Sequence, residues 1–232
     1  MRVEVLPDAE AAARRAAELI AAEAVAAVAA RGRFTLALSG GDTPARMLAL
    51  LSDTPLPWER THVFQVDERV APPGSAERNL TRITSCLGAR VNHGSGRLHP
   101  MPVDDLDLAR AAIRYGRDLE GVAGTPPVLD LVHLGLGTDG HTASLVPGDS
   151  VLAVREADVA LAGPYQGRRR MTLTLPALNR ARRLLWLVTG QDKAAVLARL
   201  GTADRALPAG LVRREGALIL ADAAAASRLQ PR

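Results

Sequence analysis

Phe34-Thr35-Leu36-Ala37-Leu38-Ser39-Gly40-Gly41-Asp42-Thr43-Pro44 is the stretch that decides the fold. Its first five residues are apolar or β-branched and predict a buried strand. A glycine turn follows, and residues 45–51 continue with the apolar spacing of a helix. Pro44 suits the first turn of that helix, where a missing N–H costs nothing. A strand, a glycine turn and a helix in succession are the building unit of an α/β fold.

The same unit recurs along the chain. Residues 2–6 predict a strand, and Asp8 and Gly32 mark the start and the end of a long Ala-rich helix. Further strands are expected at 61–66, 97–99, 129–136, 184–188 and 217–220, and further helices at 79–87, where Asn79 is the expected cap, at 106–120, at 193–200 and after Asp222. We therefore predict one α/β domain over residues 1–232, with a Rossmann-like, mostly parallel sheet and helices on both faces.

Four of the predicted strands end in polar, charged or glycine-containing segments. In open α/β sheets, ligands bind at the carboxyl ends of the strands. If these strands are parallel neighbours, their terminal segments meet at one edge and form a site. The four segments are 39–44, 67–69, 137–141 and 189–193.

Composition narrows the class of protein. A single cysteine, Cys86, excludes an internal disulfide. The first residues do not resemble a secretory signal, and the apolar stretch from Leu19 to Ala30 is too short to span a bilayer, so we expect a cytoplasmic protein without membrane contact. The net charge is +4, but the basic residues are scattered and aromatic residues make up 3% of the chain. This favours a pocket for an anionic metabolite over nucleic-acid binding.

Lys193 is the only lysine among the 29 basic residues. A compact, rotatable ammonium is not equivalent to a guanidinium fork. A lysine in the first turn of a helix also opposes the helix dipole, which a bound phosphate would offset. Chance is the competing explanation for this single residue.

The loop at 39–44 has two interpretations. Gly40 and Gly41 allow the backbone to approach an anion closely, and Ser39 and Thr43 can add hydroxyl donors at a helix N-terminus. Alternatively, the segment is an ordinary turn with a polar helix cap. It is not a Walker loop, because no Gly-Lys-Ser/Thr follows.

Asp67 and Arg69 end the next strand and fall on the same face of an extended chain. Arg69 could hold a phosphate through two hydrogen bonds, and the alternative is a surface ion pair. In the run Arg168-Arg169-Arg170, which we expect to join two short strands within residues 158–175, Arg170 is the member most suited to face a pocket. Asn179 is a candidate to support it.

The segment Gly137-Thr138-Asp139-Gly140-His141 is the most specific of the four. Histidine is suited to proton transfer near neutral pH, and Asp139 could orient the His141 ring or contact the substrate. The segment also completes a G-x-G-x-x-G pattern, but Pro147 follows too soon for the long helix that a dinucleotide-binding motif opens. No metal-ligand spacing is present. We expect neither a cofactor nor a metal.

These motifs together resemble the glucosamine-6-phosphate isomerase/6-phosphogluconolactonase family, and in particular its lactonase members. The resemblance rests on 39–44, 67–69, Gly135 to Ser144, Arg170 to Asn179, and Gly190-x-x-Lys193-Ala194, in this order. It implies the fold of glucosamine-6-phosphate deaminase. The family usually has Ser where this chain has Asp42, so we expect that acid to point away from a bound phosphate.

The resemblance implies hydrolysis of 6-phospho-D-glucono-1,5-lactone to 6-phosphogluconate in the pentose phosphate pathway. His141 would deprotonate the attacking water, with Asp139 beside it. The 39–43 loop, Arg69 and Lys193 would hold the phosphate, and Asp67 and Arg170 would complete the pocket. The implied partner is the phosphorylated lactone alone, bound by a monomer.

Two alternatives stay open. A deaminase-like isomerase of related fold would need a Glu five residues after the histidine, where this chain has Val146, and usually has Tyr where this chain has Arg69. A non-catalytic sugar-phosphate-sensing domain would follow a helix-turn-helix module. Because the recognisable domain begins near residue 2, we expect no such module.

Overall fold

The structure, a computed structural model, describes residues 1–91 and 97–230, without the side chains of Asp42 and Ala89. Its large sheet has seven strands, all parallel, in the order β1-β10-β9-β6-β2-β3-β5. These strands are β1 (Arg2–Leu6), β2 (Phe34–Leu38), β3 (Thr61–Gln65), β5 (Leu98–His99), β6 (Leu131–Leu134), β9 (Arg183–Val188) and β10 (Ala217–Asp222). The predicted parallel α/β sheet is confirmed.

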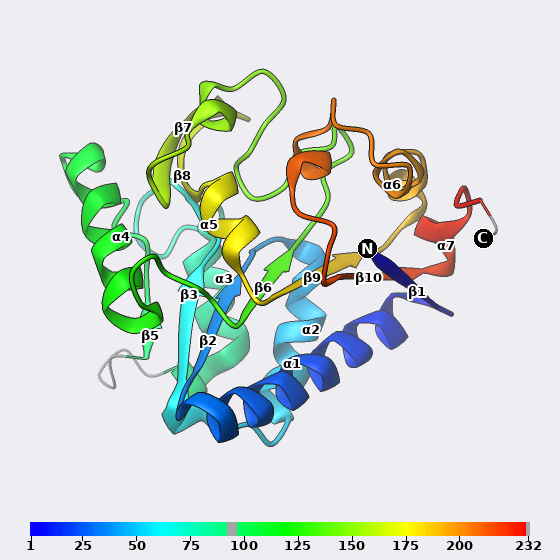
Figure 1. Cartoon of the computed structure of the whole chain (residues 1–232), viewed down its shortest axis with the longest axis horizontal. Helices are drawn as coiled ribbons and strands as arrows, with labels where there is room; N and C mark the ends of the chain where they lie inside the picture. Colours follow the sequence, from blue (N-terminus) through cyan, green and yellow to red (C-terminus); the bar gives the residue numbers. More distant parts are fainter. Residues whose placement is uncertain (92–96, 231–232) are drawn as a thin grey trace.

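Helices cover both faces of this sheet (Figure 1). One face packs against α1 (Ala9–Arg31), α2 (Asp42–Asp53) and α3 (Asn79–Leu87). The other face packs against α4 (Leu108–Ala123), α5 (Leu175–Arg180), α6 (Ala194–Gly201) and α7 (Ala223–Ala226). Short 3-10 turns are η1 (Trp58–Arg60), η2 (Gly88–Val91), η4 (Ser150–Ala153), η5 (Gln191–Lys193) and η6 (Pro208–Leu211).

Side-chain alternation explains why the strands are buried on both faces. In β9, Leu185 and Leu187 pack into the α1 side, whereas Leu184, Trp186 and Val188 pack into the opposite side. A strand that is buried on both faces therefore has a continuous apolar sequence, as parallel strands typically do.

The ends of α1 also follow the prediction. The Asp8 carboxylate accepts a hydrogen bond from the Ala11 N–H at 2.8 Å, and Gly32 ends the helix with a φ of 73°. By contrast, Asn79 is the first residue of α3 and does not cap it, because Arg78 occupies the cap position without a side-chain hydrogen bond.

A second, antiparallel sheet was not expected. It has the order β4-β8-β7, from β4 (Asp67–Arg69), β8 (Arg168–Leu173) and β7 (Val159–Tyr165). The prediction that the arginine run joins two strands is wrong, since all three arginines lie within β8. The turn is Gln166-Gly167, with φ values of 52° and 75°, because a tight hairpin needs left-handed backbone that glycine adopts freely.

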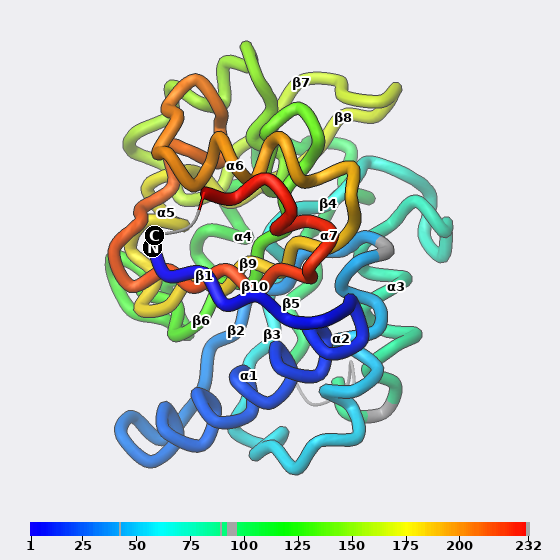
Figure 2. Tube along the Cα trace, turned by 90° about the vertical axis from the view of Figure 1, so that its right-hand side faces the viewer, coloured from blue at the N-terminus to red at the C-terminus, as the bar shows by residue number. Residues whose placement is uncertain are grey.

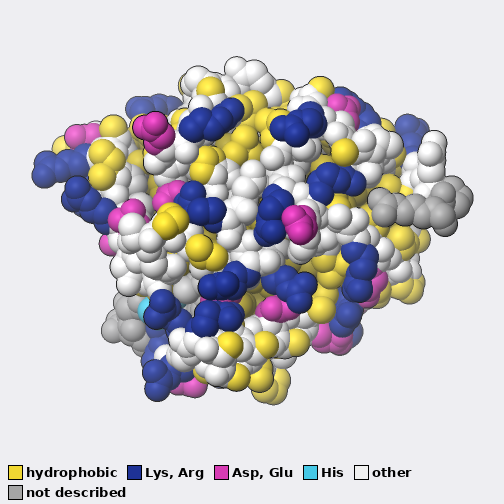
Figure 3. Space-filling model, viewed as in Figure 1, with side chains coloured by type: hydrophobic (Ala, Val, Ile, Leu, Met, Phe, Trp, Pro, Cys, Tyr) yellow, Lys and Arg dark blue, Asp and Glu magenta, His cyan; other side chains and the backbone are white. Residues whose placement is uncertain are grey.

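The second sheet places a hairpin near the carboxyl ends of the large sheet. Figures 1 and 2 show β7–β8 and α1 at opposite ends of the molecule. On the face seen in Figure 3, basic side chains are spread over the surface with acidic side chains among them. The visible face thus has no single basic patch of the kind that follows a nucleic-acid backbone.

Candidate active site

A cavity of about 200 Å³ lies at the carboxyl ends of β9, β6, β2 and β3, which are consecutive neighbours in the sheet. The four polar segments identified in the sequence therefore meet at one edge. Nine of the residues predicted to act in catalysis or to bind the substrate line the cavity: Ser39, Gly40, Gly41, Thr43, Asp67, Arg69, His141, Arg170 and Lys193. Asp139 is not among the lining residues and acts on the cavity through His141.

The 39–43 loop presents the N-terminus of α2 to the cavity. Gly41 is the cap residue, with a φ of 111°, and makes no side-chain hydrogen bond to the helix. Gly41, Thr43 and Pro44 line the cavity, so the N-terminus of α2 borders it. The Ser39 hydroxyl is not available as predicted, because it donates to the His133 carbonyl at 2.9 Å. The orientation expected for Asp42 lies outside the described residues.

Position 40 requires glycine for a steric reason that the sequence did not show. A Cβ built on it would lie 2.1 Å from the Asn79 amide oxygen. Asn79 is buried, donates to the Asp67 carbonyl and carboxylate at 2.9 and 3.1 Å, and accepts from the Arg69 guanidinium at 2.7 Å. Asn79 is a site residue that sequence reasoning missed, since its position predicted only a helix cap.

Among the side chains that the structure describes, Arg69 forms no ion pair, which was its alternative. Its hydrogen bonds go to the Asn79 amide oxygen and to the Glu77 carbonyl at 3.0 Å. Glu68, between Asp67 and Arg69, turns away from the cavity and accepts hydrogen bonds from three backbone N–H groups, those of Arg69, Asn79 and Leu80. Because side chains alternate along the strand, Asp67 and Arg69 face the cavity, whereas the Glu68 carboxylate is buried in the protein.

The Asp67 carboxylate is almost completely buried, at 4% exposed. It accepts from the Ser144 hydroxyl at 2.6 Å, and the Arg170 guanidinium lies 3.9 Å away. Burial raises the pKa of Asp67 above its usual range, although the Ser144 hydrogen bond and the charges of Arg69 and Arg170 oppose the rise. Asp67 therefore pairs with Arg170 at a cost in solvation and is linked to Arg69 through Asn79.

His141 is held by a compact turn. The Gly137 N–H donates to the His141 carbonyl at 2.9 Å, and Gly140 has a φ of 86°. The Asp139 Oδ1 accepts from the His141 backbone N–H at 3.1 Å and lies 2.6 Å from the His141 Nδ1. Burial would raise the pKa of Asp139, but its hydrogen bonds with His141 and Tyr165 outweigh this and keep the pKa below its usual value.

Of the two roles left open for Asp139, the geometry supports orientation of His141. A carboxylate on Nδ1 keeps the proton of the neutral imidazole on that nitrogen, so Nε2 is the basic atom. Gly137 makes room for the ring, since a Cβ there would lie 2.0 Å from Nδ1.

Tyr165, at the end of β7, was also missed. Its hydroxyl donates to the Asp139 Oδ2 at 3.1 Å. The Arg170 guanidinium carbon lies 5.0 Å from the centre of the Tyr165 ring, and Arg170 is only 3% exposed. No local signal could have identified Tyr165, because the contact joins the hairpin to a loop 26 residues earlier in the chain.

Lys193 and Asn179 differ in their placement. Lys193 lines the cavity as the residue before α6, with its Nζ 3.1 Å from the Asp192 carboxylate. The expectation that Asn179 supports the site is wrong. Its amide accepts from the Arg213 N–H at 2.6 Å and donates to the Leu211 carbonyl, so it secures the segment before β10.

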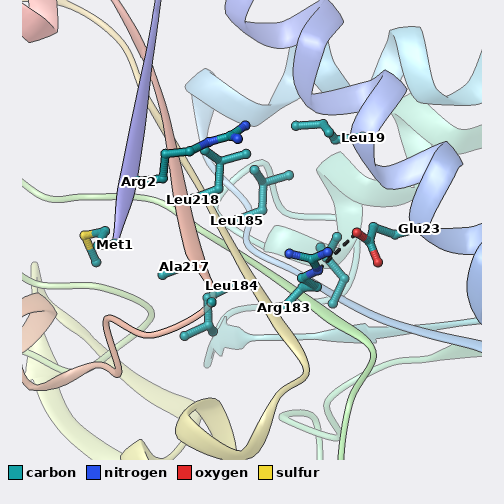
Figure 4. A pocket seen from close by; sticks show the side chains of 11 residues that line it. Met1, Arg2, Leu19, Glu23, Arg183, Leu184, Leu185, Ala217 and Leu218 are labelled. Atoms are coloured by element: carbon teal, nitrogen blue, oxygen red, sulfur yellow. Dashed lines mark ion pairs between the residues drawn. The ribbon is translucent and has the colours of Figure 1, made fainter.

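A second cavity, of about 440 Å³, lies at the other end of the strands (Figure 4). Leu19, Leu184, Leu185, Ala217 and Leu218 form much of its wall, and Arg183 at its edge pairs with Glu23 at 3.1 Å. Although this cavity is larger, no histidine lines it, and both of its arginines are already paired, Arg183 with Glu23 and Arg2 with Glu4 at 3.2 Å. Chemistry rather than volume therefore identifies the smaller cavity as the candidate active site.

The sequence matches the family model described as glucosamine-6-phosphate isomerases/6-phosphogluconolactonase over residues 7–220. It is 36% identical to a 6-phosphogluconolactonase from Nostoc, with 98% of each chain covered. The structure is similar to the 6-phosphogluconolactonase from Thermotoga maritima, with a TM-score of 0.84, 28% identity, and 95% of this chain and 98% of that one covered.

The fold alone is also shared with a monomeric glucosamine-6-phosphate deaminase, with a TM-score of 0.84, 17% identity, and 98% of this chain and all of the other covered. No helix in residues 1–91 or 97–230 is long and apolar enough to cross a membrane. The match over residues 7–220 and the full-length relatives show that the chain belongs to the glucosamine-6-phosphate isomerase/6-phosphogluconolactonase family.

Proposed function

We propose that this protein hydrolyses 6-phospho-D-glucono-1,5-lactone to 6-phosphogluconate, with His141 as the general base. One observation carries the proposal: a histidine oriented by a carboxylate at 2.6 Å lines a cavity that also holds Arg69, Arg170 and Lys193. The full-length relatives named 6-phosphogluconolactonase support the same reaction.

In this mechanism, the His141 Nε2 takes a proton from a water whose oxygen attacks the lactone carbonyl carbon. The carbonyl oxygen becomes an oxyanion, which the cationic groups of the cavity stabilise. When the intermediate collapses, the bond to the ring oxygen breaks and the imidazolium returns its proton to that oxygen. Asp139 stabilises the imidazolium between the two transfers. General-base assistance of this kind is worth roughly 10²–10⁴-fold in rate.

The phosphate would bind the N-terminus of α2 together with Arg69 and Lys193. Open N–H groups at a helix start favour an anion, and both side chains add positive charge along the same lining. Binding the phosphate fixes the lactone carbonyl relative to the attacking water, which removes entropy from the reaction before chemistry begins.

The test is a rate assay with freshly generated 6-phosphogluconolactone, corrected for spontaneous opening. His141→Ala should lower kcat roughly 10²–10⁴-fold. The matched control is His62→Ala, because His62 lies near the start of β3, away from the carboxyl ends. If His141→Ala keeps the wild-type kcat, His141 is not the base.

Phosphate recognition is tested separately with unphosphorylated gluconolactone. The wild-type protein should process it with a much lower kcat/KM than the phosphorylated lactone. Arg69→Met and Lys193→Met should raise KM for the phosphorylated lactone while changing little for the unphosphorylated one. Equal use of both substrates by the wild type would refute the roles of Arg69 and Lys193.

A deaminase-like activity is disfavoured by Val146, which offers no carboxylate at the position where such an enzyme needs one. Incubation with glucosamine 6-phosphate should therefore release no ammonia above background. The monomeric state, the cytoplasmic location and the single-domain organisation over residues 1–232 stay predictions of the sequence.

A further inference from the structure

We propose that Tyr165 is a positioning residue for the Asp139–His141 pair, through a hydroxyl that holds the Asp139 carboxylate in the orientation the base needs. This inference rests on the proposed role of His141. It adds a residue from the β7–β8 hairpin to a pair that otherwise comes from one loop.

The two oxygens of the Asp139 carboxylate bind different partners, His141 and Tyr165. Oδ1 of Asp139 receives the His141 backbone N–H and lies 2.6 Å from Nδ1, while Oδ2 receives the Tyr165 hydroxyl at 3.1 Å. The Tyr165 oxygen is 3.5 Å from Nδ1 itself, so its partner of better geometry is the carboxylate. Rotation of the carboxylate would break contacts on both sides at once, which is how a shared hydrogen-bond network fixes one orientation.

Asp139 needs such a restraint because of where it lies. Its side chain is 36% exposed and lies within the turn from Gly137 to Gly140, so water competes for both oxygens. The loop itself supplies a donor only to Oδ1. Tyr165 supplies the second anchor from a different element of the fold.

Tyr165 is itself fixed by a buried cation. The Arg170 guanidinium stacks over its ring at 5.0 Å and donates to the Tyr165 carbonyl at 3.4 Å and to the Gln166 amide oxygen at 3.3 Å. Arg170 belongs to the small sheet and lies 3.9 Å from the Asp67 carboxylate. The Tyr165 hydroxyl is therefore positioned by the Arg170 guanidinium stacked on its ring. Arg170 is in turn positioned by the buried Asp67 carboxylate in the cavity wall.

The hydroxyl has the protonation state that this role requires. Burial and the adjacent Asp139 carboxylate raise the pKa of Tyr165, so the side chain is a protonated donor at neutral pH. The Tyr165 ring centre is 5.1 Å from that of His141, so the ring also limits tilting of the imidazole.

Tyr165→Phe separates the hydroxyl from the ring, because phenylalanine keeps the stack with Arg170. We expect kcat to fall roughly tenfold, about the size of one hydrogen bond to a charged group, with KM within about twofold. The matched control is Tyr115→Phe, which loses the same atom from a hydroxyl that binds the Gln65 backbone in the core. Tyr115→Phe should keep the wild-type kcat per folded molecule. An unchanged kcat in Tyr165→Phe would overturn the proposal.

A double-mutant cycle shows whether Tyr165 acts through Asp139. If it does, adding Tyr165→Phe to Asp139→Asn should lower kcat little further. Multiplied losses, or a loss confined to KM, would overturn the proposal. If Asp139→Asn reacts no faster than the spontaneous background, the pH dependence of kcat/KM decides instead. Its acid limb should move to lower pH in Tyr165→Phe, since a carboxylate no longer held on Nδ1 stabilises the imidazolium less, and an unmoved limb counts against the proposal.

The same experiment keeps the two hypotheses apart. A wild-type rate in His141→Ala would refute the general base whatever Tyr165→Phe does. A severe loss in His141→Ala with no loss in Tyr165→Phe would refute only the role of Tyr165.

Discussion

Gly137→Ala should inactivate the protein without unfolding it. A Cβ at this position would lie 2.0 Å from the His141 Nδ1 and 2.7 Å from the Asp139 Oδ1, whereas ordinary contact begins near 3.4 Å. The imidazole must therefore retreat by more than about 1 Å, a misplacement that costs on the order of 10²-fold in rate. If Gly137→Ala lost general-base assistance completely, its kcat would be roughly 10⁴-fold below that of the wild type, which is the lowest value we expect.

The folded state should tolerate this change. Gly137 does not use left-handed backbone, so alanine introduces no φ strain and stiffens the unfolded chain, which contributes up to about 1 kcal/mol in favour of folding. The displaced side chains of His141 and Asp139 are 24% and 36% exposed, so they can move without opening the core. The thermal midpoint of Gly137→Ala should therefore stay close to that of the wild type.

The assay compares kcat for freshly generated lactone with the thermal midpoint of the same preparation. Gly135→Ala is the matched variant, because it lies in the same loop and a Cβ there meets no atom within 4 Å. Its kcat should fall far less than that of Gly137→Ala. A kcat within about tenfold of wild type for Gly137→Ala, or equal losses in both variants, would refute the view that this glycine exists to seat the His141 ring.

Three further changes test other parts of the structure. Arg78→Met should lower the free energy of unfolding by about 3 kcal/mol in urea, because it leaves the fully buried Glu68 carboxylate without its ion-pair partner at 3.2 Å; a loss below about 1 kcal/mol would contradict this. Gly40→Ala should raise KM more than it lowers kcat, since its Cβ would displace Asn79 from Arg69, and steady-state kinetics would show a pure kcat effect if this is wrong. The buried His133 has a pKa of about 4, below its usual 6.5, so the unfolded chain takes up the proton first and stability is lost as the pH falls from 6.5 toward 4. Between pH 7 and pH 5 the free energy of unfolding of the wild type should fall by about 2 kcal/mol more than that of His133→Leu. Urea unfolding of both proteins at the two pH values measures this, and an equal fall in both would exclude the effect.

The large sheet could be predicted from sequence because each strand carries its own signal. Continuous apolar runs, a glycine after α1 and the Asp8 cap are local features, and right-handed β-α-β connections then leave few arrangements. The convergence of the 39–43, 67–69, 137–141 and 189–193 segments followed from the strand directions alone. His141 and Asp139 could be found because they are two residues apart in one loop.

The second sheet could not be predicted in the same way. Asp67 pairs with Thr172 and Arg69 with Arg170, so residues about one hundred positions apart form its ladder. Nothing within a short window of sequence records such a pairing. Tyr165 and Asn79 were missed for this reason, since each owes its place in the site to a partner brought near by the fold.

The site combines residues at the strand ends of the large sheet with residues of the second sheet, and these two groups bear differently on function. The whole fold matches a glucosamine-6-phosphate deaminase as well as a lactonase, with a TM-score of 0.84 for each, so the shared architecture cannot decide between the two reactions. Its strand ends supply what any phosphorylated sugar requires, namely an open helix N-terminus and cations. This chain departs from the deaminase pattern at Val146 and Arg69. Around the imidazole it has a carboxylate on Nδ1, a glycine that makes room for the ring, and a tyrosine from the hairpin. Because Tyr165 of the hairpin donates to the Asp139 carboxylate beside the base, the reaction rate should depend on contacts between the hairpin and the loop that carries His141, and the double-mutant cycle between Tyr165 and Asp139 measures that dependence directly.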